Sequence, residues 1–178
     1  EIASCLVGSE MCIRDRYGNR AYEDTLVQME DVAKECGFDV IAAVAAVAEH
    51  SIMHQYAAGR PDADDEKQLE TFAEQISVKE GTVTSVPGNR PYKKGGGAGL
   101  VPKVTADCVK CGLCAESCPV KAIDQHSFKA DSKSCISCMR CVSQCPHNAR
   151  KVSGVMVGIV GLALKKACSL RKENELYL

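Results

Sequence analysis

Two runs of cysteine constrain this chain of 178 residues more than any other feature. Each run has the spacing Cys-x2-Cys-x2-Cys-x3-Cys-Pro, and the second repeats the first further along the chain. The first run contains Cys108, Cys111, Cys114 and Cys118, and the second contains Cys135, Cys138, Cys141 and Cys145. Thiolates at such short intervals curl a backbone around a metal centre. We expect this segment to need no large apolar core, because metal binding supplies much of the folding free energy.

The repeated spacing resembles the bacterial two-cluster ferredoxin pattern, in which the fourth cysteine of each run binds the other cluster. The resemblance implies one [4Fe–4S] cluster on Cys108, Cys111, Cys114 and Cys145. It implies a second cluster on Cys135, Cys138, Cys141 and Cys118. We therefore predict a two-[4Fe–4S] ferredoxin domain over residues 104–151, which transfers electrons one at a time between redox partner proteins.

Structural zinc and disulfides are the alternative uses of so many cysteines. Zinc sites usually combine two cysteine pairs that a long loop separates, and two triplets each followed by Cys-Pro suit that arrangement poorly. Disulfide frameworks are typical of small secreted domains, but no signal-peptide pattern precedes these runs. Free thiolates indicate a reducing compartment, so we expect a cytoplasmic protein.

The charge and hydropathy of the chain indicate no nucleic-acid or membrane partner. The formal net charge is −1 and no basic stripe with interleaved aromatic residues is present. The longest apolar run, Val155–Leu164, is interrupted by glycines and is shorter than the ~18–20 residues of a transmembrane helix. Residues 104–151 carry seven Lys and Arg against four Asp and Glu. Because each oxidised cluster with its thiolates carries about −2, we expect no strongly acidic docking face.

The first residues, Glu1–Arg16, show neither hydrophobic periodicity nor helix caps. Read back through the genetic code, Leu6–Arg16 resembles a transposase-type sequencing-library adapter. On that interpretation residues 1–16 are an artefact, the protein sequence begins near Tyr17, and Cys5 and Cys12 carry no function. The alternative is a genuine N-terminal segment.

Residues 17–81 have the pattern of an α/β fold. Apolar residues at helical spacing predict a helix from Leu26 to Cys36, which Gly37 ends. A nearly continuous apolar run predicts a buried strand over 38–48, and a second amphipathic helix follows, with Leu69, Phe72, Ala73 and Ile76 directed inward. Because one strand cannot satisfy its own backbone groups, we interpret residues 17–81 as the C-terminal part of a larger domain. Residues 82–103, rich in glycine and proline, predict a linker, and residues 152–178 a C-terminal helix and tail.

Several short motifs outside the cysteine runs are similar to those of a family of flavodoxin-like/ferredoxin fusion proteins. They are Tyr17–Asp24, Glu49–Ser51, Gly59–Asp62, Gly88–Tyr92 and Arg171–Leu178. The resemblance implies an α+β protein in which the two-cluster ferredoxin module follows a partial flavodoxin-like α/β fragment. It also implies a flavin mononucleotide (FMN) beside Gly18 and Asn19. The family's phosphate-binding loop has no counterpart in this sequence, so we expect FMN only in a full-length parent.

Three functions are compatible with these patterns. The first is an electron carrier, in the parent coupled to a flavodoxin-like FMN domain. The second is a flavin- and iron–sulfur-dependent oxidoreductase that acts on a small molecule, although no acid–base or nucleophilic group indicates a catalytic site. The third is a zinc-stabilised interaction module. Acid-labile sulfide and broad absorption near ~400 nm distinguish iron–sulfur from zinc.

Overall fold

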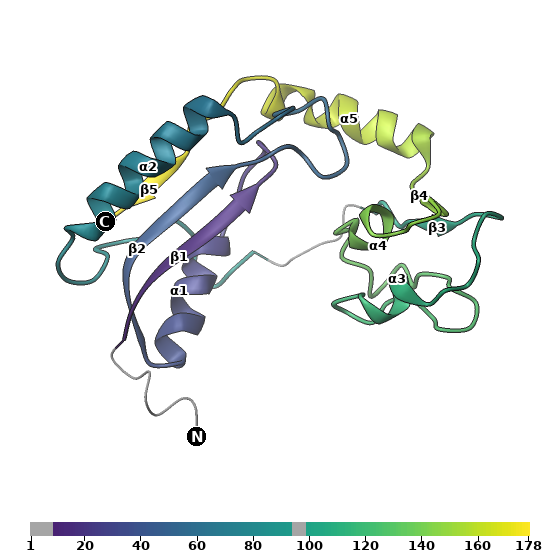
Figure 1. Cartoon of the computed structure of the whole chain (residues 1–178), viewed down its shortest axis with the longest axis horizontal. Coiled ribbons are helices and arrows are strands. Elements are labelled where there is room, and N and C mark those ends of the chain that lie inside the picture. Colours follow the sequence, from purple (N-terminus) through teal and green to yellow (C-terminus); the bar gives the residue numbers. More distant parts are fainter. Residues whose placement is uncertain (1–8, 94–98) are drawn as a thin grey trace. The chain divides into compact units, whose positions relative to one another are not determined.

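The computed structural model describes residues 9–93 and 99–178 and divides the chain into two compact units (Figure 1). The first unit contains Glu1–His50, His54–Lys94 and Lys166–Leu178. The second contains Ser51–Met53 and Gly95–Lys165. The mixture of helices and strands is compatible with the expected α+β class.

The first unit is built on a three-stranded sheet in the order β1 (Ser9–Tyr17), β2 (Phe38–Val47) and β5 (Glu175–Tyr177). Strands β1 and β2 are parallel, and β5 runs antiparallel to β2. The predicted strand over 38–48 is thus confirmed as β2. Its residues from Ala42 to Val47 are all buried, as a central strand with both faces covered requires.

Strand β1 was not predicted, because Glu1–Arg16 shows no hydrophobic periodicity that would indicate a strand. Residues 9–16 form most of this strand, which pairs in register from Ser9 opposite Phe38 to Tyr17 opposite Val47. The physical reason is the open edge of β2, whose backbone groups need hydrogen-bond partners. The strand does not test the adapter origin of the segment, which stays a prediction, and residues 1–8 lie outside the described residues.

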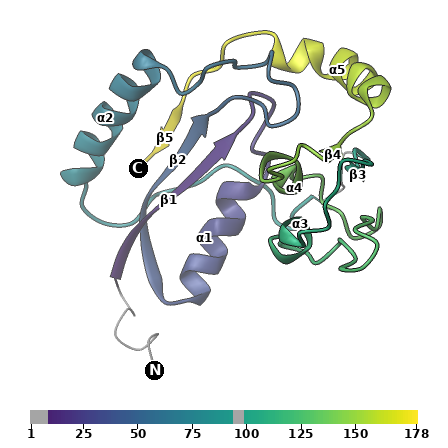
Figure 2. The same cartoon turned by 45° about the vertical axis from the view of Figure 1, so that its right-hand side comes forward.

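Helix α1 (Thr25–Glu35) confirms the first predicted helix and lies alongside β1 and β2 in both views (Figures 1 and 2). Leu26 and Val27 on this helix are fully buried and join the core cluster with residues of both strands. Gly37 follows the helix with a φ of +83°, a left-handed conformation that favours glycine, and its N–H bonds to the Lys34 carbonyl.

Helix α2 (Ala63–Ser77) begins with a capping box. The Asp62 carboxylate accepts from the backbone N–H groups of Asp64 and Asp65, and the Asp65 carboxylate accepts from the Asp62 N–H. The face predicted to point inward is only partly covered. Leu69, Phe72 and Ile76 are half-buried, and Ala73 is exposed, which corrects that part of the prediction.

The C-terminal tail is tied to the first unit by buried polar groups. Asn174 accepts a 2.8 Å bond from the Val47 N–H and donates a 3.0 Å bond to Asp65. Asp65 is also paired with Arg60, and both side chains of this ion pair are buried. The tail therefore belongs to the sheet unit even though it follows the cysteine runs in sequence.

The predicted linker over 82–103 is wrong for its first half. Val83 and Val86 are buried in the core of the first unit, and the Val83 N–H bonds to the Val40 carbonyl at 2.8 Å. Gly88 has a φ of +144°, and a Cβ at this position would overlap the Val27 side chain. Its glycine thus permits close packing rather than flexibility. The glycine run at 94–98 lies outside the described residues.

The second unit contains little regular structure. A two-stranded ribbon of β3 (Lys103–Val104) and β4 (Arg150–Lys151) accompanies two single-turn helices, α3 (Leu113–Glu116) and α4 (Arg140–Ser143). Its cluster of buried apolar residues consists of Ala115, Ile123 and Phe128. This small core agrees with the expectation that the segment folds around metal.

Helix α5 (Gly154–Cys168) follows the ribbon, as the predicted C-terminal helix. Val155, Met156, Ile159 and Leu162 are exposed on it, so one apolar side of the helix faces solvent. Across the described residues, no helix has both the length and the apolar character needed to cross a membrane.

Candidate metal centre

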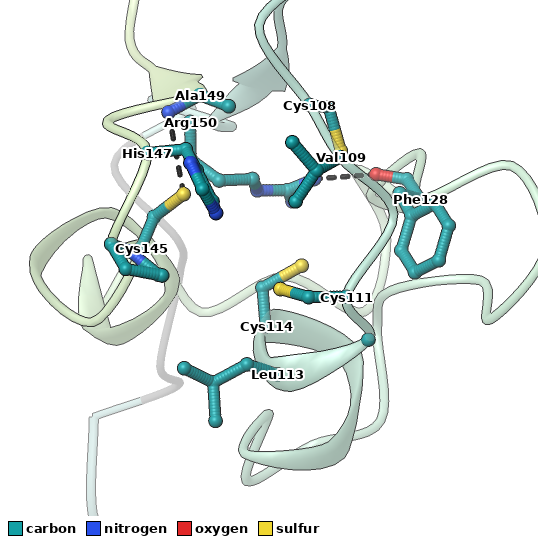
Figure 3. A pocket seen from close by; sticks show the side chains of 12 residues that line it. Cys108, Val109, Cys111, Leu113, Cys114, Phe128, Cys145, His147, Ala149 and Arg150 are labelled. Atoms are coloured by element: carbon teal, nitrogen blue, oxygen red, sulfur yellow. Dashed lines mark hydrogen bonds between the residues drawn. The ribbon is translucent and has the colours of Figure 1, made fainter.

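The eight cysteines of the two runs surround two separate hollows in the second unit. The first hollow has about 340 Å³ of empty space, its open mouth included, and the second about 360 Å³. Cys108, Cys111, Cys114 and Cys145 line the first hollow (Figure 3). Cys118, Cys135, Cys138 and Cys141 line the second. Each hollow thus receives three cysteines from one run and the fourth from the other, the same division that the sequence pattern implies for two clusters.

The backbone turns at corresponding points in the two runs. Left-handed residues flank the second cysteine of each run on both sides, and another lies three positions after the fourth cysteine. The pairs are Lys110 and Ser137 (φ 60° and 55°), Gly112 and Met139 (85° and 59°), and Lys121 and Asn148 (52° and 49°). Residues with side chains adopt this conformation at a cost of about 1–2 kcal/mol each. Because this conformation recurs at corresponding positions, the two runs share a backbone conformation as well as a sequence pattern.

The fourth cysteine of each run also has a corresponding hydrogen bond. The Cys118 sulfur accepts from the Ala122 N–H, and the Cys145 sulfur accepts from the Ala149 N–H, both at 3.3 Å. An N–H directed at sulfur stabilises a thiolate and fixes its direction, as partners around metal ligands do. The chain itself therefore orients the fourth cysteine of each run.

The walls of the hollows are apolar but not closed. Among the apolar residues near the cysteines, Ile123 and Met139 are buried, whereas Leu113, Val120 and Ile136 are exposed. Cys111 and Cys138 are the most open ligand candidates, each exposed where the other six are half-buried. The hollows thus reach solvent near the second cysteine of each run.

The ionisation of the thiols depends on burial. Burial raises the pKa of Cys114 and of Cys141 above that of a free cysteine, and the positive charge of Arg150 acts in the opposite direction. Because iron binds the thiolate, metal binding must release the protons of these groups.

Arg150 is the residue of the site that sequence reasoning missed. It belongs to β4, is 2 % exposed, and lines both hollows. One guanidinium N–H group donates to the Phe128 carbonyl, across the first hollow in Figure 3. Its only signal in the sequence is a cation five residues after the last cysteine, a position that by itself does not distinguish a buried arginine from a solvated one.

The chemistry of the donors fits two iron–sulfur clusters: eight thiols line the hollows in two sets of four, and a backbone N–H donates to the fourth sulfur of each run. Over the described ranges, no group of three or more His, Cys, Asp or Glu side chains is placed to hold a single metal ion.

Comparison with protein families decides the class of the site. Residues 107–149 match the family model described as a 4Fe-4S dicluster domain. This part of the second unit is therefore similar to 4Fe–4S dicluster domains. The match includes all eight cysteines of the runs and supports iron–sulfur electron transfer. A search of curated proteins found no match to the chain.

The residues expected beside a flavin lie in the first unit, in the turn after β1. Gly18 packs so closely that a Cβ there would come within 2.9 Å of the His50 Cα. Asn19 is buried, and its amide nitrogen donates to the carbonyls of Cys168 and Leu170 at 2.8 and 2.9 Å. These contacts give Asn19 a structural role in holding the end of α5, and its contact with FMN stays a prediction.

Proposed function

We propose that this chain is an electron carrier whose dicluster domain holds two [4Fe–4S] clusters through crossed cysteine sets. In a longer parent protein, we propose that it is coupled to a flavodoxin-like FMN domain. Bound clusters of this type supply one-electron transfer. Redox proteins are the donors and acceptors that this chemistry requires.

One observation carries the proposal: each hollow is lined by three cysteines of one run and the fourth of the other. Cys145 joins the first three cysteines of the first run, and Cys118 joins those of the second. Such an exchange ties both ends of the domain together, so that neither centre can form without the other half of the chain. It also brings the two centres into one small domain, which short-range electron transfer between them requires.

The exposed rims of the hollows support exchange with partner proteins. Val109 lines the first hollow and is 58 % exposed, and Ile136 lines the second and is 53 % exposed. Each lies close in sequence to an exposed cysteine, Cys111 or Cys138. We propose that donor and acceptor approach at these rims, where an apolar side chain permits close contact.

The arrangement of the first unit supports the flavin part of the proposal. In parallel α/β sheets, ligands bind at the carboxyl ends of the strands. The segments that follow the parallel strands β1 and β2 meet there: the Ala48 N–H bonds to the Tyr17 carbonyl at 2.9 Å, and Gly18 packs against His50. The two loops that the family resemblance assigns to the flavin are thus neighbours.

Pairs of cysteine variants test the crossed ligation. After anaerobic reconstitution, Cys118→Ala should contain about half the iron and sulfide of the wild type, because one of two four-iron clusters is lost. Adding Cys135→Ala should cause no further loss, since both residues are assigned to the same cluster. Adding Cys108→Ala instead should remove the remaining iron. Cys36→Ala, outside both runs, is the control and should keep both clusters.

The opposite pattern would overturn the ligand assignment. If Cys118→Ala with Cys108→Ala kept half the iron while Cys118→Ala with Cys135→Ala kept none, each run would hold its own cluster. A wild-type chain that bound zinc but no iron under the same conditions would overturn the function itself.

A further inference from the structure

Among the residues that the structure describes, Arg150 is a buried cation that pairs with no carboxylate. Its side chain lies within the dicluster domain at 2 % exposure. Within residues 9–93 and 99–178 no salt bridge includes Arg150, and its Nε and one terminal nitrogen have no hydrogen-bond partner. A buried charge left uncompensated costs several kcal/mol. Its persistence in the fold therefore indicates that an anion balances it.

The position of Arg150 identifies where that anion lies. Of all the residues that line the two hollows, Arg150 alone is common to both. Pairing with Val104 in the β3–β4 ribbon holds its backbone, and the bond to the Phe128 carbonyl holds one end of its guanidinium. The planar guanidinium has five N–H donors in a rigid fork. Because one nitrogen is anchored, the others are held in the wall between the hollows.

We infer that Arg150 is a cation shared by both iron–sulfur centres, which it stabilises in the reduced state through its unpaired N–H groups. The inference rests on the proposed function, since it needs two centres in the hollows. Each oxidised cluster with its four thiolates carries about −2, and one-electron reduction adds a further negative charge. A fixed cation attracts the reduced form more strongly than the oxidised form, so Arg150 raises both reduction potentials.

The arrangement has a consequence for electron exchange between the centres. A cation that lay beside one hollow only would separate the two potentials. A cation in the shared wall acts on both and keeps their potentials closer together. An electron can then pass between the centres with a smaller difference in free energy.

The test compares variants of the full-length chain, reconstituted anaerobically and titrated with dithionite under electron paramagnetic resonance. Arg150→Met keeps the length and apolar stem of the side chain but removes the charge. We expect the reduction equilibrium of both clusters to shift toward the oxidised form by about tenfold, which for one electron corresponds to 59 mV. Arg150→Lys keeps the charge without the planar fork, and we expect shifts in the same direction but smaller.

Arg140→Met is the matched control. Arg140 also lines the second hollow, but it is exposed and does not line the first. Solvent screens an exposed charge, so we expect no change at the first cluster and a small one at the second.

Several outcomes would overturn the inference. Unchanged potentials in Arg150→Met at full iron and sulfide content would show that Arg150 has only a structural role. A shift at one cluster alone would show that the cation is not shared. If Arg150→Met lost its clusters, Arg150→Lys would decide. Loss of the clusters or unchanged reduction potentials in Arg150→Lys would also contradict the inference. A wild-type chain that bound no clusters would instead refute the proposed function. The two failures are distinguishable, because the reduction potentials of the Arg150 variants are measured only on protein that contains clusters.

Discussion

The two units of this chain are stabilised by different means. In the first, Leu26, Val27 and the central residues of β2 are removed from water, and buried or hydrogen-bonded carboxylates tie the loops and the tail to that core. In the second, only three buried residues form the core cluster, and most of the described chain surrounds the two hollows. Burial of apolar surface stabilises the first unit by itself. The second unit has too little such surface, so we expect its stability to depend on the clusters.

Removal of iron should give the largest difference between the units. Anaerobic treatment with a chelator is expected to unfold residues 104–151, because metal binding provides most of their folding free energy. Hydrogen exchange followed by mass spectrometry should show loss of amide protection in this segment. Peptides covering β2 should keep theirs. Loss of amide protection in both units, or in neither, would contradict the claim that only the second unit depends on the clusters for its stability.

Disruption of a buried ion pair should selectively weaken the first unit. Asp65→Ala leaves the Arg60 guanidinium buried without its carboxylate, which costs about 3–5 kcal/mol. All five tyrosines lie in the first unit, so tyrosine fluorescence during urea unfolding reports that unit, whereas cluster absorption reports the second.

The neighbouring carboxylate supplies the control for that measurement. Asp64→Ala changes an exposed side chain of the same helical turn and should cost less than about 0.5 kcal/mol. Equal effects of the two substitutions would show that the Arg60–Asp65 pair does not stabilise the unit.

Acid should produce the smallest effect, again in the first unit. Hydrogen bonds from Arg90 and Tyr92 lower the pKa of Asp31 from 3.8 to about 2. Because the folded pKa lies below the unfolded one, this carboxylate stabilises the fold fully above about pH 4, and the contribution is lost as the pH falls toward 2. Titration of the Asp31 carboxyl by nuclear magnetic resonance checks the value. In Arg90→Met the pKa should return toward 3.8, and an unchanged value would show that Arg90 is not the cause.

Local sequence patterns predicted the helices and strands whose formation depends mainly on residues close together in the sequence. Helix α1 with its glycine end and strand β2 were predicted correctly, because helical spacing and apolar continuity are properties of short segments. The spacing of the cysteines predicted the segment that matches the dicluster family model. The linker prediction failed over residues 82–93. Glycine and proline there reflect tight packing, as at Gly88, and composition cannot distinguish packing from flexibility.

By itself, the sequence predicted an iron–sulfur domain, because the spacing of the cysteines is a property of the order of residues. Only the tertiary structure decided which distant segments become neighbours. It joined β1 and β5 to β2, it brought Asn174 to Asp65, and it placed Arg150 between the two hollows. These outcomes depend on backbone pairing and on the burial of charge, which are settled by contacts across the whole fold and leave no periodic signal in the chain.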